Sequence, residues 1–376
     1  MEILNPGVYV RELAGEDRSI KGVGTSTAAF VGVAEMGPVD QALMVSSFAE
    51  FKVNFGNFLS ESWLAHSVLQ FFNNGGTRLY IARVMGRGST AIQEIDYQKA
   101  FTLLDSVADI NLVAVPGIGS PSMVSFGSDY CQKRGDCFFI GDMSLCDSTK
   151  ENAQTFIGNI DLKSSYAAVY FPWLKMKDPS GTSSETIAVP ASGAVAGIYA
   201  RIDARRGVWK AAAGGESNIN GATGLLVNIT DHEQNTINPI GVNVIRAFQS
   251  RGIIIWGART LATRSDPEYK YVPVRRTAIY IKQSIDRGIQ WAVFEPNDEA
   301  LWTKVRLNVE AFMQSLFRQG AFQGSKSEKA YFVRCDRGTT TQSDVNQGIF
   351  NILVGFSPAK PAEFVVLKLS QKSGQK

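Results

Sequence analysis

The sequence predicts an α/β protein with two α/β domains and an extended strand near each end. Three observations predict this fold. Strand-like apolar runs alternate with helical stretches over the first two thirds of the chain, and a long amphipathic helix with two further strands follows a turn-rich boundary. A short strand pattern near each terminus is separated from the body by polar or proline-containing residues. The alternation favours a mostly parallel sheet covered by helices.

The composition is that of a globular chain with a sizeable core. Of the 376 residues, 44% are hydrophobic and 19% are charged, which is typical of folded domains rather than of disordered segments. The formal net charge of +3 is too small to indicate a nucleic-acid-binding protein.

Residues 1–22 contain a strand pattern without an obvious partner. An Asn-Pro-Gly turn signal precedes β-branched and aromatic residues that favour a strand: Val8, Tyr9, Val10 and Arg11. The polar stretch 14–18 then ends the pattern. Because the N–H and C=O groups of a lone strand need a second strand, the partner must come from elsewhere.

Residues 23–262 carry the alternating elements. Strands are predicted at residues 27–34, 79–84, 111–115, 137–140, 166–171 and 253–256. Helices are predicted at residues 62–72, 148–157 and 191–204. Ser148 is a candidate N-cap for the second of these helices, and an Asn-Asn-Gly-Gly sequence ends the first. The Gly/Asn-rich residues 214–224 predict a surface loop.

Residues 263–376 form a second unit. The boundary 263–273 is followed by predicted helices at 274–287 and 298–319, the longer of which has one apolar stripe. Predicted strands at 330–335 and 348–356 follow, and residues 357–361 interrupt the chain. A last strand is predicted over 363–369, and its central residues are Phe364, Val365, Val366, Leu367 and Lys368.

The sequence contains no recognisable motif for catalysis, a cofactor or a metal. His66 lies in an amphipathic helix and His232 in a predicted loop beside Asp231, which does not make a nucleophile–base pair. The four cysteines lack CxxC spacing, so reduced thiols are expected rather than a metal site. The stretch 113–119 lacks the third glycine of a phosphate-binding loop and predicts a plain strand-to-helix turn. The chain is therefore expected to be no enzyme and to hold no cofactor.

The N-terminus lacks the pattern of a signal peptide, and no run of 18 apolar residues is present. We therefore expect a protein made in the cytoplasm, without direct membrane insertion.

Seven stretches in order resemble the sheath proteins of contractile phage tails and contractile injection systems. They are residues 5–13 (NPGVYVREL), 166–174 (YAAVYFPWL), 206–214 (RGVWKAAAG), 256–261 (WGARTL), 271–276 (YVPVRR), 294–298 (FEPND) and 361–369 (PAEFVVLKL). Residues 86–165 match least, and Ala212 stands where the family often has Pro. The modest length resembles sheaths of extracellular, phage-tail-like injection systems more than larger phage sheaths.

The resemblance implies a mechanical role. Sheath subunits of this family form a six-fold helical cylinder around an inner tube, and contraction of the cylinder drives the tube through a target envelope. It implies a 1–22 arm, a 23–262 outer domain, a 263–360 inner domain and a 361–376 arm. The arms would add strands to the inner domains of neighbouring subunits, which agrees with the two unpartnered strands. Baseplate and terminator or cap proteins are further implied partners, and the particle is either cytoplasmic, membrane-anchored or released.

The charge is unevenly distributed. Residues 263–376 hold 17 Lys/Arg and 11 Asp/Glu, a balance of +6, whereas residues 1–262 have a balance of −3. This favours either an inner domain that faces an acidic tube or a solvated basic surface. Lys304 and Arg318, on the polar side of the long helix, are the candidate tube-facing residues.

Two other classes of function stay open at this point. One is an α/β enzyme or ligand-binding protein without a recognisable motif, which predicts a deep pocket with perturbed titratable groups. The other is a nucleic-acid-binding protein, which would need a concentrated basic stripe that the sequence lacks.

Overall fold

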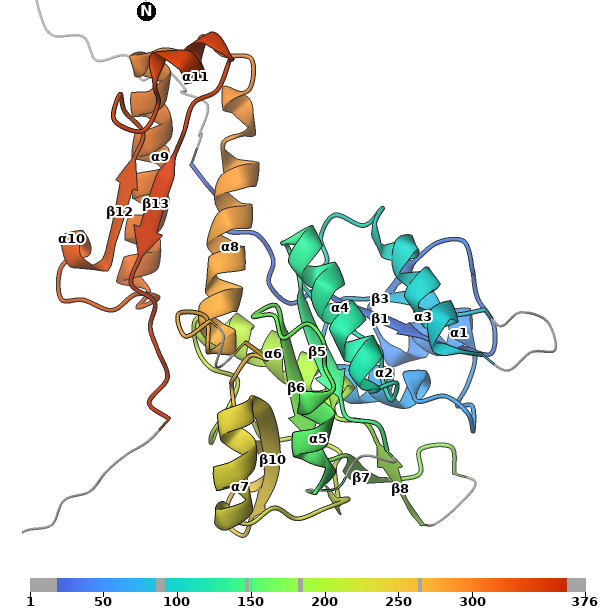
Figure 1. The fold of residues 1–376 in the computed structure, drawn as a ribbon. Helices are drawn as coiled ribbons and strands as arrows, with labels where there is room; N and C mark the ends of the chain where they lie inside the picture. Colours follow the sequence, from blue (N-terminus) through green and yellow to red (C-terminus); the bar gives the residue numbers. More distant parts are fainter. Residues whose placement is uncertain are drawn as a thin grey trace, which may run out of the picture.

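A computed structural model describes residues 19–85, 92–145, 149, 151–181, 185–262 and 266–363. The predicted terminal strands at 8–11 and 364–368 lie outside these residues. Figure 1 shows two parts: a large body built on one sheet, and a narrower C-terminal domain in which two long helices lie beside a two-stranded sheet. The prediction of a mixed α/β fold with a mostly parallel sheet is confirmed.

The body is organised around an eight-stranded sheet of order β11-β10-β6-β5-β4-β1-β3-β2. The strands are β1 (Ala28–Gly32), β2 (Leu43–Val45), β3 (Leu79–Arg83), β4 (Leu112–Ala114), β5 (Phe138–Asp142), β6 (Ala167–Phe171), β10 (Val242–Phe248) and β11 (Gly252–Ile255). Only the outermost strands β2 and β11 pair antiparallel. The six central strands run parallel, as expected for strands joined by helical crossovers.

Helices cover both faces of this sheet. One face is covered by α1 (Phe48–Phe55), α2 (Leu64–Asn73) and α6 (Ser192–Arg206). The other is covered by α3 (Glu94–Ala100), η1 (Phe101–Leu104), α4 (Pro121–Arg134), α5 (Asn152–Gly158), α7 (Asp231–Ile237) and η2 (Asn238–Ile240). A small sheet of β7 (Leu174–Lys177), β8 (Thr186–Val189) and β9 (Gly224–Leu225) extends the body at one side.

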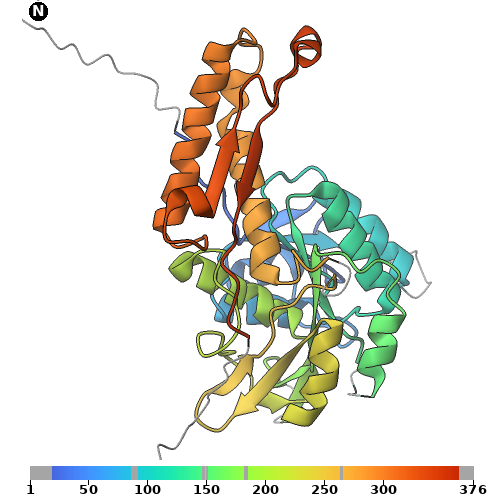
Figure 2. The ribbon, with the colours of Figure 1, turned by 60° about the vertical axis from the view of Figure 1, so that its left-hand side comes forward.

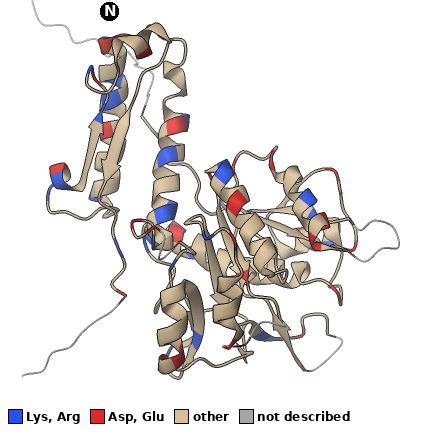
Figure 3. Ribbon diagram, in the orientation of Figure 1, with Lys and Arg blue, Asp and Glu red and all other residues tan. Residues whose placement is uncertain are grey.

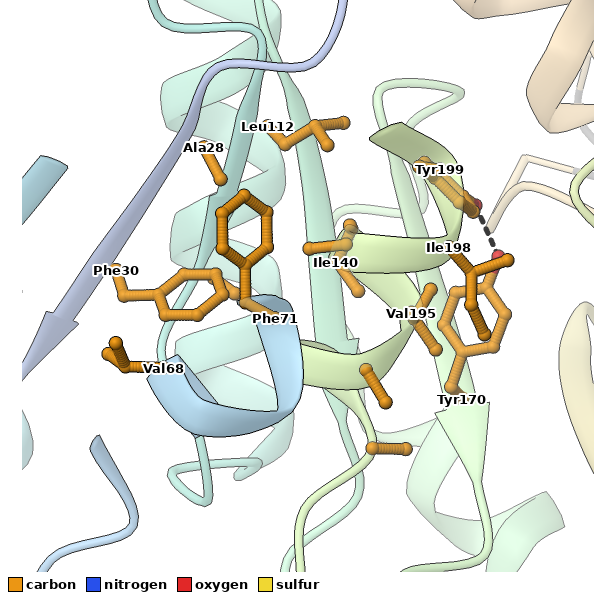
Figure 4. Close-up of a cluster of buried hydrophobic side chains, with 14 of the residues drawn as sticks. Ala28, Phe30, Val68, Phe71, Leu112, Ile140, Tyr170, Val195, Ile198 and Tyr199 are labelled. Carbon is orange, nitrogen blue, oxygen red and sulfur yellow. Dashed lines mark hydrogen bonds between the residues drawn. The ribbon is translucent and has the colours of Figure 1, made fainter. Parts of the chain in front are cut away.

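Alternate residues of β1 belong to different cores. Phe30 points to the face covered by α2, where it meets Phe71 edge-on, while Ala29 and Val31 point to the opposite face. All five residues of β1 are buried. Figure 4 shows the first of these cores, with Phe30 and Phe71 from neighbouring elements and a hydrogen bond between the hydroxyls of Tyr170 and Tyr199. Burial on both faces explains the continuous apolar pattern of the strand.

The C-terminal domain is built from α8 (Val272–Gly288), η3 (Gln290–Ala292), α9 (Glu299–Arg318), α10 (Ser327–Ala330), β12 (Tyr331–Arg334), α11 (Gln342–Asn346) and β13 (Leu353–Phe356). The apolar stripe of α9, with Val305 and Val309 fully buried, packs toward α8 and the two strands and forms a third core. The N-cap Asp298 accepts a hydrogen bond from Leu301 N at 2.8 Å, as predicted for the start of this helix. Figure 2 shows that this domain projects from one side of the body.

Three local predictions differ from the structure. His232 lies in α7, not in a loop, because Thr230 and Glu233 form a capping box that starts a short helix there. The strand predicted at 348–356 is shorter, because Gly348 at φ 73° and the bond from Ile349 N to Asp344 O terminate α11. Ser148 lies outside the described residues, and the residue at the start of α5 is Glu151, which makes no side-chain cap.

Candidate functional site

The two-stranded sheet of the C-terminal domain has two free edges within the described part of the chain. β12 pairs antiparallel with β13, from Tyr331 opposite Phe356 to Arg334 opposite Leu353, and neither strand has another described neighbour. Phe332 and Leu353 stay 47% and 51% exposed. Because a lone two-stranded sheet is marginal and open edges are templates for further strands, this sheet is a candidate acceptor of strands from elsewhere.

The first described residues run along α8 away from the body. Val23 N donates to Ser284 Oγ at 3.1 Å, and Ile20 is buried in the core of the C-terminal domain against the last turn of α8. A Cβ at Gly22 would lie 2.0 Å from the hydroxyl oxygen of Tyr280, so any other residue here would displace the Tyr280 ring. The first described residue, Ser19, therefore lies near the end of α8.

The last described residue is anchored to the body. The carboxylate of Glu363 accepts two hydrogen bonds from the Arg259 guanidinium, both at 2.7 Å, one from Asn238 at 2.8 Å and one from the Tyr271 hydroxyl at 3.0 Å. Burial raises the pKa of this carboxyl, but the hydrogen bonds from Arg259 and Asn238 outweigh burial and hold the pKa below its ordinary value. Because the Arg259 and Glu363 side chains are 7% and 18% exposed, the pair fixes where the following residues start.

A buried ion pair joins the two domains. Arg276 of α8 bonds Asp203 of α6 through Nη2 at 2.6 Å and Nη1 at 3.1 Å, and the two side chains are 5% and 3% exposed. Thr25 completes the junction, since its hydroxyl donates to Asp203 at 2.7 Å and its carbonyl accepts from Arg276 at 2.9 Å. The Arg276 guanidinium also lies 4.5 Å from the ring centre of Tyr199. The N-terminal segment, the body and the C-terminal domain are thus tied together at one point.

Comparisons with known proteins agree with this architecture. Residues 90–261 match the family model of the phage tail sheath protein central domain, and residues 264–372 match that of the phage tail sheath C-terminal domain. The sheath of the extracellular contractile injection system PVC, in its contracted state, is 30% identical over 99% of both chains with a TM-score of 0.78. The chain belongs to the contractile tail sheath family. The resemblance inferred from the seven stretches is therefore confirmed.

Other sheath relatives match in part or over the whole chain. The contracted helical sheath of the anti-feeding prophage is 29% identical over 98% of this chain and 100% of that one, with a TM-score of 0.80. The tail sheath protein of Vibrio phage KVP40 is 24% identical over 57% of this chain, and the chain spans only 31% of that relative's length. A putative prophage major tail sheath protein of Pseudomonas aeruginosa is 28% identical over 69% of this chain and 66% of its own.

Among the described residues, His66 and Asp231 are engaged in structural contacts rather than in a nucleophile–base pair. His66 is buried beside Phe58 and Trp63, and burial lowers its pKa. Asp231, the neighbour of His232, pairs with Arg246 instead. Because the matches are to structural tail sheath proteins, the enzyme alternative gains no support.

A buried carboxyl at the end of β5 is likewise used for structure. Burial raises the pKa of Asp142 to about 6, and its oxygens accept hydrogen bonds from Ser192 N at 2.8 Å, Ser192 Oγ at 2.5 Å and Gly117 N at 3.3 Å. It caps the start of α6 and the turn after β4. No group of three or more His, Cys, Asp and Glu side chains suited to a metal occurs in the described ranges.

The predicted site residues fall in two groups. Val8 to Arg11 and Phe364 to Lys368 lie outside the described residues. Lys304 and Arg318 are both exposed on α9, about four turns apart on the same side, and neither has an ion-pair partner among the described residues. Figure 3 shows Lys and Arg at several places along α8 and α9. The residues missed by sequence reasoning are Glu363 and Arg276, whose partners lie 104 and 73 positions away.

Among the described residues, no helix combines the length and the apolar character needed to cross a membrane.

Proposed function

We propose that this chain is the protomer of a helical contractile sheath that polymerises around an inner tube and contracts to drive the tube through a target envelope. The observation that carries the proposal is the open two-stranded sheet β12–β13, in a chain that continues beyond the described residues by segments 1–18 and 364–376. The sequence supplies strand patterns in both segments, and the sheet supplies edges for them.

In this proposal the two arms bind different neighbours. Residues 8–11 and 364–368 add strands to the β12–β13 sheets of adjacent subunits. The N-terminal segment leaves near the end of α8, whereas the C-terminal segment leaves from the Glu363 anchor on the body. Donation of this kind is heterologous, so it propagates along a lattice and does not close a dimer.

In this proposal the two domains have different roles. Residues 23–262 form the outer domain and residues 263–360 the inner domain, which faces the tube through exposed basic residues including Lys304 and Arg318. Each exposed contact is weak, with an interaction energy of about 0–1 kcal/mol, and this permits release of the tube on contraction. The extended cylinder is metastable, and a difference of a few kcal/mol per subunit, summed over many subunits, drives contraction.

The partners follow from this role. They are neighbouring sheath subunits in a six-fold helical assembly, the inner tube protein, a baseplate and a terminator or cap protein. The solved relatives include chains of the anti-feeding prophage baseplate and of its contracted helical sheath, which supports association with sheath subunits and a baseplate. The subunit is made in the cytoplasm and becomes part of a phage-tail-like particle.

The test is deletion of residues 1–13. We expect the full chain, expressed with its tube protein, to give striated cylinders by negative-stain electron microscopy. The deletion should abolish cylinders and leave the circular dichroism spectrum unchanged, because the three described cores are formed by residues from Ile20 onward.

The matched control is deletion of residues 371–376 (QKSGQK), a polar stretch beyond the predicted C-terminal strand. This variant should still assemble. Contractile cylinders from the chain that lacks residues 1–13 would exclude strand donation by that arm. Monomers from the full chain with and without tube protein would exclude the sheath function itself.

A further inference from the structure

A fully exposed aromatic residue stands at the far end of the C-terminal domain. The loop 292–298 between η3 and α9, here called the tip loop, contains a β-turn closed by a hydrogen bond from Glu295 N to Ala292 O at 3.3 Å. Val293 has φ −68° and ψ 129°, and Phe294 has φ 69°. These angles are those of a type II turn, whose third position requires a positive φ and usually holds glycine or asparagine.

Phenylalanine is unfavourable at this position because of its backbone conformation. Phe294 is the one non-glycine residue with positive φ in the described ranges, and a bulky residue is strained there. Its side chain is 103% exposed and its neighbour Val293 is 56% exposed, so the ring makes no packing contact that would offset the strain. A strained, exposed aromatic residue is best explained by a contact made outside the subunit.

The loop that presents Phe294 is held in one shape. Ala292 is buried beneath it, and Trp302 Nε1 donates to Asn297 Oδ1 at 2.8 Å. Asn297 in turn donates to the carbonyl of Ile349 at 3.0 Å, which ties the tip loop to the segment after α11. The ring is therefore presented by a preorganised loop, and little ordering is needed on binding.

A cleft of about 840 Å³ lies at the opposite end of the same domain, where it meets the body. Its walls come from the end of α6, from α7, from β10 and the segment after β11, from the end of α9 and from residues 359–363. Aromatic side chains line it, namely Trp209, Trp256 and Tyr271, and each is only partly buried within the subunit. A cleft of this size with aromatic walls can receive a phenyl ring and the residues beside it.

The charges of the two surfaces are complementary. Five Lys or Arg side chains and two acidic side chains line the cleft. Both acids are already paired, Asp231 with Arg246 and Glu363 with Arg259, whereas the exposed Lys360 has no partner among the described residues. The tip loop carries Glu295 and Asp298 and no Lys or Arg. The tip loop is thus acidic and aromatic, whereas the cleft is basic and aromatic, and the charges of the two surfaces are complementary.

The tip loop and the cleft lie at opposite ends of α9, a helix of 20 residues, about 30 Å long. Figures 1 and 2 place the loop at the start of α9, beside α11, and residues 359–363 at the other end near α7 and β10. They cannot meet within one subunit. We propose that Phe294 of one subunit inserts into the cleft of a second copy of this chain, in a head-to-tail contact that is separate from strand donation. Such a contact is heterologous and propagates along a stack of subunits.

This inference rests on the proposed sheath function, and a paired-cysteine experiment separates the two. The variant Val293→Cys/Asn235→Cys keeps the Phe294 ring and places one thiol on the exposed tip loop and one on α7 at the cleft wall. Assembled cylinders, oxidised with diamide, should give a ladder of dimers, trimers and larger species on non-reducing gels, because each subunit carries both partners. Each variant with only one of the two introduced cysteines, and the unmodified chain with its four native cysteines, is a control and should give no ladder. If the double variant forms cylinders but gives no ladder, the contact between tip loop and cleft is excluded. If the unmodified chain forms no cylinders, the proposed sheath function itself is excluded.

Two substitutions at position 294 test the role of the ring. Phe294→Gly removes the ring and relieves the backbone, so we expect the Tm of the unassembled chain to stay unchanged or to rise by up to about 2 °C while assembly is lost. Phe294→Ala keeps a Cβ at positive φ and should also impair assembly. Val53→Ala, at a 75% exposed residue of α1, is the matched control and should assemble normally. Normal assembly of Phe294→Gly would overturn the proposal.

The partner itself is identified by placing p-benzoylphenylalanine at position 294 in assembled particles and irradiating them. Cross-linked peptides should pair the tip loop with the cleft of another sheath subunit, such as residues 231–239. Cross-links to the tube protein alone would assign the tip to the tube and overturn the contact between copies.

Discussion

The body and the C-terminal domain differ in how completely each buries its sheet. In the body, the strands β1, β4, β5 and β6 are buried at every residue, and helices cover both faces of the sheet. In the C-terminal domain, β12 and β13 have only one buried residue between them, Val333. Phe294, Phe332, Ile349 and Leu353 are each at least 45% exposed.

The difference indicates which surfaces serve the subunit and which serve the assembly. A sheet covered on both faces needs no partner, whereas an open two-stranded sheet beside exposed apolar residues remains incomplete until a neighbour binds. If the proposed strand donation is correct, stability should depend mainly on the body, and polymerisation through the arms should depend on the C-terminal domain. Substitutions of similar size in the two regions should consequently have different effects.

The largest expected effect is on the body. Phe30→Ala removes a fully buried ring that packs against Phe71 and should lower the free energy of unfolding by about 3–5 kcal/mol. Phe332→Ala, at a 47% exposed residue of β12, should change it by less than about 0.5 kcal/mol and impair assembly instead. Urea denaturation of unassembled protein, followed by circular dichroism, measures both. Equal decreases in the free energy of unfolding for the two variants would contradict the proposed difference between the body and the C-terminal domain.

The next effect is at the junction between the two regions. Arg276→Ala leaves Asp203 charged and buried without its partner, and the free energy of unfolding should fall by about 3 kcal/mol. The loss comes from the unpaired carboxylate, so Arg276→Met/Asp203→Leu should recover most of it. If the single variant unfolds in two separate transitions by calorimetry, the pair couples the domains. An unchanged single transition with no loss of stability would show that it does not.

The sequence predicted the elements whose signal is local. The alternation of apolar runs predicted β1, β3, β4, β5 and β6. The helix predicted at 298–319 from its apolar stripe agrees with α9 to within one residue at each end. Short elements such as β2 and β7 were missed because three or four residues do not establish a period, and the longer elements β10 and α4 were not predicted either. The arms stay predictions, since they lie outside the described residues.

The contacts that organise the candidate site were not predictable from the sequence in the same way. Arg259 and Glu363 are 104 positions apart, and nothing in either neighbourhood marks them as partners. Asp203 precedes Arg205 and Arg206, the basic residues of the last turn of α6, but its own partner lies on α8. Phe294 lay in the FEPND stretch that carried the family resemblance, yet only the backbone angle shows that it is strained.

The smallest effect concerns the anchor that ties the C-terminal segment to the body, and it depends on pH. The pKa of Glu363 is lowered in the folded state, so its stabilising contribution is present above the unfolded value of about 4.3 and is lost as the pH falls through the lower folded value. Glu363→Gln removes the charge and should cost about 1.5–2 kcal/mol at pH 7, because Arg259 loses its charged partner.

At pH 3 the difference in free energy of unfolding between the unmodified chain and Glu363→Gln should be smaller than at pH 7, since protonation then removes the same charge from the unmodified chain. Denaturation of unassembled protein at pH 3, 5 and 7 measures this difference. Glu295→Gln, on the exposed tip loop and without a described partner, is the control and should show no such trend. A difference that stays constant with pH would mean that the Glu363 charge does not stabilise the anchor, and the start of the C-terminal arm would then depend on the neutral hydrogen bonds from Asn238 and Tyr271 alone.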